Sequence, residues 1–216
     1  MHKTVDNLIS IKNELKIKTN IQTEPKIIAV SKTFGIAEIK PLIDYGHLDF
    51  GENKVQEAFD KWDFIKKENN NINLHLIGKL QSNKVKLAVS IFDFIHSVDN
   101  KKLAEKIANQ QIQQNKKIKV FIQINIGEET QKTGIYKNQL PDFYKFCKSL
   151  KLDVIGIMCI PPNVKNVSKY FKEMSEIKKS LNFKEMSMGM SSDYLEAASY
   201  SSTYLRIGSK IFGERS

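Results

Sequence analysis

The stretch KIIAVSKTFG, residues 26–35, decides how the rest of the chain is interpreted. An apolar run rich in β-branched residues ends in Ser31, Lys32 and Thr33, and then breaks at Gly35. Such a run is typical of a buried strand, whereas lysines normally lie on the solvated surface. We therefore expect Lys32 to lie at the tip of a strand because it is positioned there for a chemical role.

The same pattern, a short apolar run followed by a stretch of helical periodicity, recurs along the chain. The predicted strands cover residues 26–32, 48–52, 74–78, 92–98, 119–126, 152–158, 185–189 and 202–208. The predicted helices cover residues 36–45, 53–68, 80–89, 99–115, 137–149, 164–181, 192–200 and 209–213. Because parallel neighbours need crossover helices, this alternation predicts an α/β fold, a closed (β/α)8 TIM-type barrel rather than an open sheet.

The N-terminal segment predicts one more helix, ahead of the barrel. Val5, Leu8, Ile9 and Leu15 recur at helical spacing, which places an amphipathic helix within residues 1–22, packed on the barrel. No linker is visible in the remaining sequence, and the length suits one barrel with few insertions. Residues 1–216 are therefore predicted to form a single domain.

Composition limits the class of protein. The chain is 41% hydrophobic and 27% charged, which is typical of a soluble globular protein. No run approaches the roughly 18 apolar residues of a membrane helix, and the N-terminus is unlike a secretory signal. Cys147 and Cys159 form no CxxC pair, so a metal site and a disulfide framework are poorly supported. A reducing, cytoplasmic setting fits best, and we expect a monomer.

The net charge of +10 makes nucleic-acid binding one interpretation, because clustered lysines neutralise phosphates. The lysines are spread over the whole length, however, and most fall on predicted polar helix faces. This distribution favours a solvated surface over a nucleic-acid interface. A small molecule that carries a phosphate would be attracted by the same field.

The active site of a barrel of this type lies at the carboxyl ends of its strands. Phosphate sites in such barrels frequently follow strands 7 and 8, often where a helix begins. The two corresponding segments are SMGMSSD, residues 187–193, and RIGS, residues 206–209, and each combines glycine with hydroxyl groups. We therefore predict a phosphate cradle there, opposite Lys32.

A strand-end lysine beside a phosphate cradle is suited to a Schiff base with a carbonyl group. That carbonyl belongs either to a sugar phosphate or to pyridoxal 5'-phosphate. Arg206 bears on the choice, because a guanidinium that faces a pyridine nitrogen holds it unprotonated and weakens the ring as an electron sink. A phosphate contact or an ion pair is the alternative role for Arg206.

The sequence resembles the pyridoxal-phosphate homeostasis protein family, whose members are relatives of the barrel domain of bacterial alanine racemase. The resemblance covers most of the chain, and it rests above all on GENKVQEA (residues 51–58), LQSNK (80–84), SMGMS (187–191) and RIGSKIFG (206–213). The sequence departs from the usual pattern at Lys54 and Lys79, where the family often has tyrosine and histidine. Whether a second lysine reaches the mouth of the barrel stays open.

The resemblance implies a role for six residues. Lys32 would form the internal aldimine with pyridoxal 5'-phosphate, and Arg206 would face the pyridine nitrogen. The implied phosphate ligands are Ser191, Gly208 and Ser209, and Asn53 would line the ring or its substituents.

The resemblance also implies a function: a protein that holds pyridoxal 5'-phosphate and contributes to vitamin B6 homeostasis without strong turnover. Transient contact with pyridoxal-phosphate-dependent apoenzymes would follow. The alternative is an amino-acid racemase or a similar low-activity enzyme. Racemases of this type need a second acid–base residue from an added β domain, and the sequence stops at Ser216, just after the last predicted strand and helix. We therefore expect binding rather than catalysis.

Three further residues have ordinary interpretations. His75 and His96 lie within apolar strand runs and are predicted to be hydrogen-bonded histidines of the core or rim, with a role as general base as the alternative. Trp62 is predicted to pack in the core from the second barrel helix.

Overall fold

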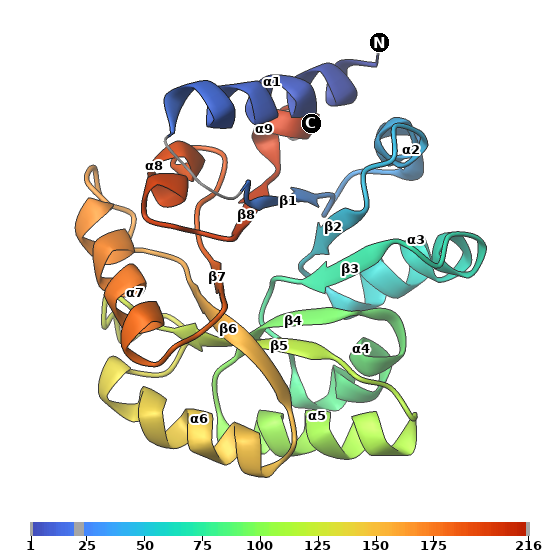
Figure 1. The fold of residues 1–216 in the computed structure, drawn as a ribbon. Helices are drawn as coiled ribbons and strands as arrows, with labels where there is room; N and C mark the ends of the chain where they lie inside the picture. Colours follow the sequence, from blue (N-terminus) through green and yellow to red (C-terminus); the bar gives the residue numbers. More distant parts are fainter. Residues whose placement is uncertain (1, 20–23, 215–216) are drawn as a thin grey trace.

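The computed structural model describes residues 2–19 and 24–214. Within these residues, eight parallel strands follow one another around a closed barrel, and β8 pairs with β1 to complete it (Figure 1). The strands are β1 (Lys26–Val30), β2 (Asp49–Glu52), β3 (Asn73–Leu76), β4 (Phe94–Val98), β5 (Lys119–Ile124), β6 (Asp153–Cys159), β7 (Glu185–Ser187) and β8 (Tyr204–Ile207). The predicted (β/α)8 barrel is confirmed.

The helices of the described residues form the outer layer around the strands (Figure 1). They are α1 (Lys3–Lys18), α2 (Ile36–Asp44), α3 (Val55–Glu68), α4 (Val85–Ile91), α5 (Lys101–Gln113), α6 (Leu140–Ser149), α7 (Ser168–Ser180), α8 (Tyr194–Ser199) and α9 (Ser209–Phe212). Two short 3-10 helices, η1 (Ser82–Lys84) and η2 (Lys137–Gln139), precede α4 and α6.

The positions of several helix starts differ from the prediction. The helix predicted at 80–89 begins at Val85, after a loop and η1. Leu80 is buried although it lies in that loop. Its apolar side chain therefore extends the helical spacing of apolar residues in the sequence beyond the true start of the helix. The helix predicted at 164–181 likewise begins later, at Ser168. Both segments follow strands at the mouth of the barrel, where loops also bury apolar residues.

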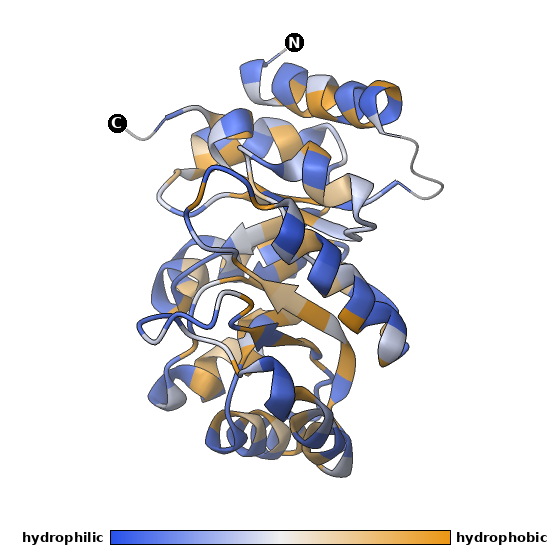
Figure 2. Ribbon diagram, turned by 90° about the vertical axis from the view of Figure 1, so that its left-hand side faces the viewer, coloured by the Kyte–Doolittle hydropathy of each residue, from blue (hydrophilic) through white to orange (hydrophobic). Residues whose placement is uncertain are grey.

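Apolar packing has two parts. The larger core lies between the strands and the helices, and a smaller cluster fills the inside of the barrel. The inner cluster consists of Ile28, Phe94, Phe121, Met158 and Tyr204. In Figure 2 the strands are mostly orange, whereas the helices alternate between orange and blue, as expected for helices with one face on a sheet. Trp62 is fully buried in the outer core, which confirms its predicted packing role.

The additional N-terminal helix is present and lies beside α9 (Figure 1). Its buried residues include Val5, Leu8 and Leu15, as the spacing predicts. The side-chain amide of Asn7 donates to the carbonyl oxygen of Ile211 in α9 at 2.9 Å, which fastens the helix to the end of the barrel. The helix ends at Lys18, and the remainder of the predicted 1–22 segment falls largely outside the described residues. Among the described residues, no helix combines the length and apolar character that a membrane crossing requires.

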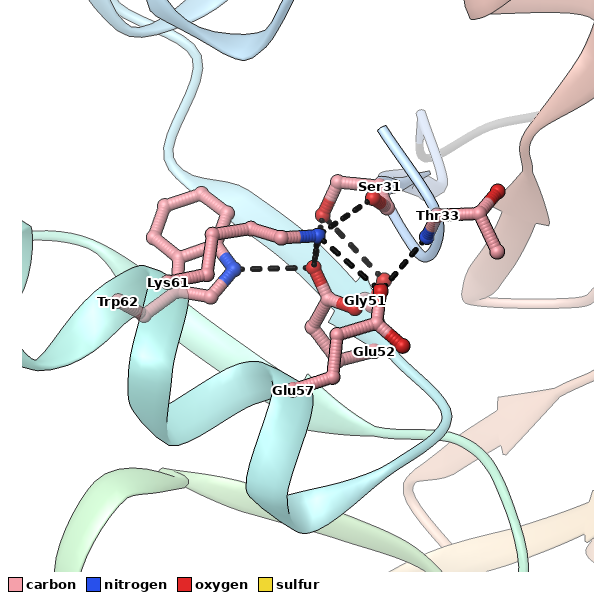
Figure 3. Close-up of polar contacts among 7 residues, drawn as sticks. All are labelled: Ser31, Thr33, Gly51, Glu52, Glu57, Lys61 and Trp62. Atoms are coloured by element: carbon pink, nitrogen blue, oxygen red, sulfur yellow. Dashed lines mark hydrogen bonds and ion pairs between the residues drawn. The ribbon is translucent and has the colours of Figure 1, made fainter. Parts of the chain in front are cut away.

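The turn after β1 corrects the prediction that Lys32 stands at a strand tip. The strand ends at Val30, and Lys32 lies in the turn that follows. Thr33 has a φ of 70°, in the left-handed region that residues other than glycine seldom adopt. The carboxylate of Glu57 on α3 accepts a hydrogen bond from the backbone N–H of Thr33 at 2.7 Å, and this tertiary contact stabilises the turn (Figure 3).

A buried carboxylate fixes the other side of the same turn. Oε1 of Glu52 accepts hydrogen bonds from Ser31 Oγ at 2.8 Å, Lys61 Nζ at 3.0 Å and Trp62 Nε1 at 3.0 Å (Figure 3). Lys61 Nζ also donates to the carbonyl oxygen of Ser31 at 3.0 Å. Together with the Glu57 contact, these bonds hold both neighbours of Lys32, and we call Glu52, Glu57 and Lys61 the turn clamp.

Substitution of the buried cation tests the turn clamp. The side chain of Glu52 is 0% exposed and that of Lys61 11%, so Lys61→Met leaves a buried carboxylate without its cation. We expect a loss of about 3 kcal/mol in the free energy of unfolding, measured by urea denaturation. Lys40→Met, which breaks an exposed pair with Asp44, serves as the control and should cost less than about 0.5 kcal/mol.

The double variant Glu52→Gln/Lys61→Met removes the stranded charge together with its partner. We expect it to be more stable than Lys61→Met alone, because the neutral amide has a smaller desolvation cost. A double variant that is as unstable as the single one would contradict the explanation.

Candidate functional site

One cavity opens at the carboxyl ends of the strands, with a volume of about 710 Å³. All six residues predicted from the sequence line it: Lys32, Asn53, Ser191, Arg206, Gly208 and Ser209. Of the two lysines left open by the sequence, Lys79 also lines the cavity, whereas Lys54 is the N-cap residue of α3 and is not one of its lining residues. Among the described residues, no three His, Cys, Asp or Glu side chains are grouped to hold a metal ion.

The turn between β8 and α9 directs backbone donors toward a hydroxyl group. The N–H groups of Gly208 and Lys210 both donate to Ser191 Oγ, at 3.2 and 3.3 Å. The loop that carries Ser191 is held in turn by Asp193, whose carboxylate accepts from the backbone N–H of Met190 at 2.6 Å. Successive backbone N–H groups that converge on one oxygen are typical of anion-binding turns.

Arg206 forms the floor of the cavity as a buried cation. Its Nη1 donates to Ser187 Oγ at 2.7 Å and its Nη2 to the carbonyl oxygen of Cys159 at 2.9 Å. No carboxylate among the described residues forms an ion pair with it. Burial lowers the pKa of the guanidinium from its ordinary value. Its remaining N–H groups are donors for a ligand in the cavity.

Asn53 owes its position to a close backbone approach. It follows β2 directly, and the backbone of Gly78, after β3, passes against it. A Cβ atom at position 78 would lie 2.3 Å from the carbonyl oxygen of Asn53, a distance that no side chain tolerates. Gly78 is therefore required for Asn53 and Lys79 to stand together at the mouth of the cavity.

Several polar residues that line the cavity were given no role from the sequence, among them Gln123 and Thr133. Gln123 on β5 is buried, and its side-chain amide donates to Thr133 Oγ1 at 3.0 Å; both residues line the cavity. A glutamine inside the apolar run KVFIQINI was a signal for an inward-facing polar position, because strand side chains alternate between the two faces. Thr133 gave no such signal, since it comes from the loop after β5.

The two strand histidines lie deeper than the cavity. His75 and His96 are both fully buried, and neither is one of its lining residues. Nδ1 of His75 and Nε2 of His96 are 3.0 Å apart, so the two rings are hydrogen-bonded to each other. The interpretation as hydrogen-bonded core histidines is confirmed.

Comparison with known proteins agrees with this geometry. Residues 8–216 match the family model "Alanine racemase, N-terminal domain". The pyridoxal phosphate homeostasis protein of Pasteurella multocida is 35% identical over 201 residues, which cover 88% of this chain and 86% of the relative.

Two solved structures are also similar. PipY of Synechococcus elongatus, solved with pyridoxal phosphate (PLP) bound, superposes with a TM-score of 0.81 at 29% identity, covering 97% of this chain and 100% of that one. Alanine racemase of Clostridium difficile superposes with a TM-score of 0.77 at 14% identity, covering 99% of this chain and 57% of that one. An identity as low as the second shows a common fold and nothing more.

The family model, the curated relative and the PipY structure thus each match most of this chain. This chain belongs to the pyridoxal phosphate homeostasis protein family, within the larger family of the alanine racemase N-terminal domain.

Proposed function

We propose that this chain binds pyridoxal 5'-phosphate reversibly in the cavity at the barrel mouth and so contributes to vitamin B6 homeostasis. The observation that carries the proposal is the convergence of a lysine, a buried arginine and an anion-binding turn on one cavity. The family and the PLP-bound structure of PipY support the same ligand. When bound, this cofactor supplies an aldehyde that condenses with amines and a pyridine ring that can accept electrons.

The residues of the cavity fit the phosphate end of the molecule. Ser191, Gly208 and Ser209 would hold it with hydroxyl and backbone N–H donors. The N–H groups of Gly208 and Lys210 already converge on Ser191 Oγ, so donors suited to an anion are oriented before any ligand arrives. Donors that need no rearrangement reduce the free energy that binding costs.

Arg206 fits the ring end of the molecule. Because a guanidinium offers donors only, it would face an acceptor, and the pyridine nitrogen is an acceptor when it carries no proton. Arg206 would therefore keep that nitrogen unprotonated and limit the ring as an electron sink. Asn53, beside the ring, would supply a polar contact. This arrangement favours holding the cofactor over transforming a substrate on it.

Lys32 would supply the amine that joins the aldehyde. The turn clamp holds the residues on both sides of it, so the direction in which its side chain leaves the backbone is fixed. Lys79 adds a second amine at the mouth of the cavity. Retention of the ligand would thus combine one reversible covalent link with hydrogen bonds at the phosphate and at the ring.

The proposal also covers the compartment, the oligomeric state and the partners of the protein. Cys147 and Cys159 are free, buried thiols, which supports a reducing, cytoplasmic compartment. The net charge of +10 opposes self-association and supports a monomer. A protein that holds the cofactor reversibly would release it to pyridoxal-phosphate-dependent apoenzymes through transient contact.

The racemase alternative has no specific observation in its favour. Racemisation needs an acid–base group on each face of the substrate. Among the described residues that line the cavity, the titratable groups are Lys32, Lys79, Lys210, Arg206 and Glu214, with no tyrosine, histidine or cysteine. Turnover of L- or D-alanine by the purified protein, above the level of Lys32→Ala, would support the alternative.

Reduction with borohydride tests the role of Lys32. We expect a protein loaded with pyridoxal phosphate to be yellow, and the label to be recovered on the peptide that contains Lys32 after reduction and mass spectrometry. Lys32→Ala should lose this label, and Lys40→Ala, which removes an exposed lysine, should keep it. Label spread over surface lysines in the wild-type protein would contradict the proposal.

Two substitutions distinguish an effect on the affinity for the cofactor from an effect on the electronic state of its pyridine ring. Ser191→Ala removes a hydroxyl from the phosphate end, and we expect a roughly tenfold rise in Kd, equal to about 1.4 kcal/mol. Arg206→Ala should change the absorbance spectrum of the bound cofactor more than its Kd. Ser180→Ala, on the exposed face of α7, is the control. Equal loss of affinity in both variants, with unchanged spectra, would show that the two roles are wrongly assigned.

A further inference from the structure

A continuous chain of hydrogen bonds runs through the inside of the barrel, away from the cavity. Arg206 Nη1 is 2.7 Å from Ser187 Oγ, which is 3.0 Å from His96 Nδ1. Nε2 of His96 is 3.0 Å from Nδ1 of His75, and Nε2 of His75 is 3.0 Å from Oδ1 of Asp49. We call Ser187, His96, His75 and Asp49 the interior relay.

The relay crosses the barrel, since its members come from different strands. Ser187 ends β7, His96 is on β4, His75 is on β3 and Asp49 begins β2. Asp49 therefore lies at the amino end of the strands, opposite the cavity. Its side chain is 17% exposed, and the side-chain amide of Asn73 also donates to it, at 3.1 Å.

The two ends of the chain determine the direction of every bond when both imidazoles are neutral. Arg206 can only donate, so Ser187 Oγ accepts from it and its own hydrogen is available for His96 Nδ1. His96 then donates from Nε2 to His75 Nδ1. His75 donates from Nε2 to Asp49, which accepts as a carboxylate. With neutral imidazoles, all four bonds are satisfied only if both rings carry their proton on Nε2, whereas a doubly protonated His75 would reverse the two bonds between it and Ser187.

The charge states of the members agree with this direction. Burial lowers the pKa of His75 even though Asp49 raises it in part, and burial lowers that of His96 well below its ordinary value. Burial alone would raise the pKa of Asp49, but the hydrogen bond from His75 and the positive charge of Lys26 help to keep it below its ordinary value. Two neutral imidazoles thus stand between a cation and a carboxylate.

Aromatic neighbours prevent the two rings from turning. His75 stacks on Phe94 with centroids 4.2 Å apart and planes 15° apart. His96 stacks on Phe121 with centroids 4.2 Å apart and planes 23° apart. A ring stacked in this way keeps both nitrogens in line with its partners. Phe94 and Phe121 of the inner cluster therefore fix the orientation of the two imidazole rings in the relay.

Packing alone does not require this chain. Barrel interiors are usually filled with branched apolar side chains, and buried polar groups cost free energy unless each finds a partner. The relay ends at Arg206, a buried cation that forms no ion pair with a described carboxylate. Hydrogen bonds in series polarise one another at low dielectric, so a charge at one end affects the other.

We propose that the interior relay is a positioning device for Arg206. Ser187 and His96 fix the guanidinium as a donor that faces the cavity, and Asp49 provides the remote negative charge that balances it. The proposal rests on the proposed function, because the acceptor that Arg206 meets is then the ring nitrogen of pyridoxal phosphate. Side chains that never touch the ligand would in this way set its electronic state.

The direction of the relay is tested first, on the protein without ligand. Nitrogen-15 NMR at pH 7 distinguishes imidazole tautomers, which must otherwise be inferred. We expect His75 and His96 to be neutral with the proton on Nε2. A proton on Nδ1 of either ring, or a doubly protonated ring, would overturn the proposal. This result does not depend on whether the protein binds pyridoxal phosphate.

The influence of the relay on Arg206 is tested on the loaded protein. Ser187→Ala and His96→Phe each break the chain, and we expect each to shift the absorbance maximum of bound pyridoxal phosphate while Kd stays within about threefold. The double variant should shift it no further than either single variant, because both interrupt one chain. Ile28→Val changes the same inner cluster without breaking a hydrogen bond of the relay or removing a ring that stacks on it, and should leave the maximum in place.

Additive shifts, or shifts no larger than that of Ile28→Val, would overturn the proposal. If His96→Phe fails to fold, Ser187→Ala, which removes a single hydroxyl, decides the question alone against the same control. Wild-type protein that takes up no pyridoxal phosphate would refute the proposed function, and the tautomers would still decide the direction of the relay.

The contribution of Asp49, at the end of the relay away from the cavity, is tested with a matched pair of variants. Asp49→Asn removes the charge but keeps an acceptor oxygen, and we expect a shift of the absorbance maximum in the same direction as that of Ser187→Ala. Asp153→Asn neutralises an exposed carboxylate at the start of β6, on the same end of the barrel, and should cause none. Equal shifts from the two variants would mean that overall charge, not the relay, acts on the site.

Discussion

The pairing of β8 with β1 is the constraint on which the site depends. The two strands lie in parallel register from Lys26 opposite Tyr204 to Ala29 opposite Ile207. The residues that follow them, from opposite ends of the sequence, therefore emerge side by side at one rim. A Cβ atom at Gly208 would lie 3.4 Å from Val30, just ahead of the turn that carries Lys32. Closure of the barrel thus brings Lys32 and the turn at Gly208 to the same rim, although they lie far apart in the sequence.

Polar side chains away from the cavity maintain this arrangement. On the amine side, the turn clamp of Glu52, Glu57 and Lys61 holds the backbone around Lys32. At the cavity floor, Ser187 and the carbonyl oxygen of Cys159 hold the guanidinium of Arg206. Apart from Glu57, whose side chain is 28% exposed, these groups are buried or nearly so, where an unpaired charge or donor would cost free energy. The barrel therefore carries two polar systems, one outside the strands and one within them.

The sequence predicted the elements and their order because each strand and helix has a strong local signal. The six residues that the family resemblance implied all line the cavity, at the rim where the carboxyl ends of the parallel strands meet. The sequence pattern placed Lys32 on the strand, however, because the left-handed conformation of Thr33 depends on a contact with Glu57 that lies far along the chain. Tertiary contacts of this kind leave no mark on local periodicity.

The interior relay shows the same limit more fully. His75 and His96 each looked like an isolated polar residue in an apolar run, and Ser187 looked like the first hydroxyl of the predicted phosphate cradle. Only the register of the barrel brings them within hydrogen-bonding distance of one another.

The Ser191 side of the cavity is tied to the N-terminal helix, as the Lys32 side is tied to α3. Lys210 Nζ, in α9, donates to Glu14 on α1 at 3.1 Å and to the hydroxyl of Tyr194 on α8 at 2.8 Å. Tyr194 donates in turn to Glu14 at 2.6 Å. The helix that precedes the barrel therefore braces the very turn whose N–H groups meet Ser191. Such bracing supports the proposed reversible binding, because donors that are already ordered bind an anion without first losing conformational freedom.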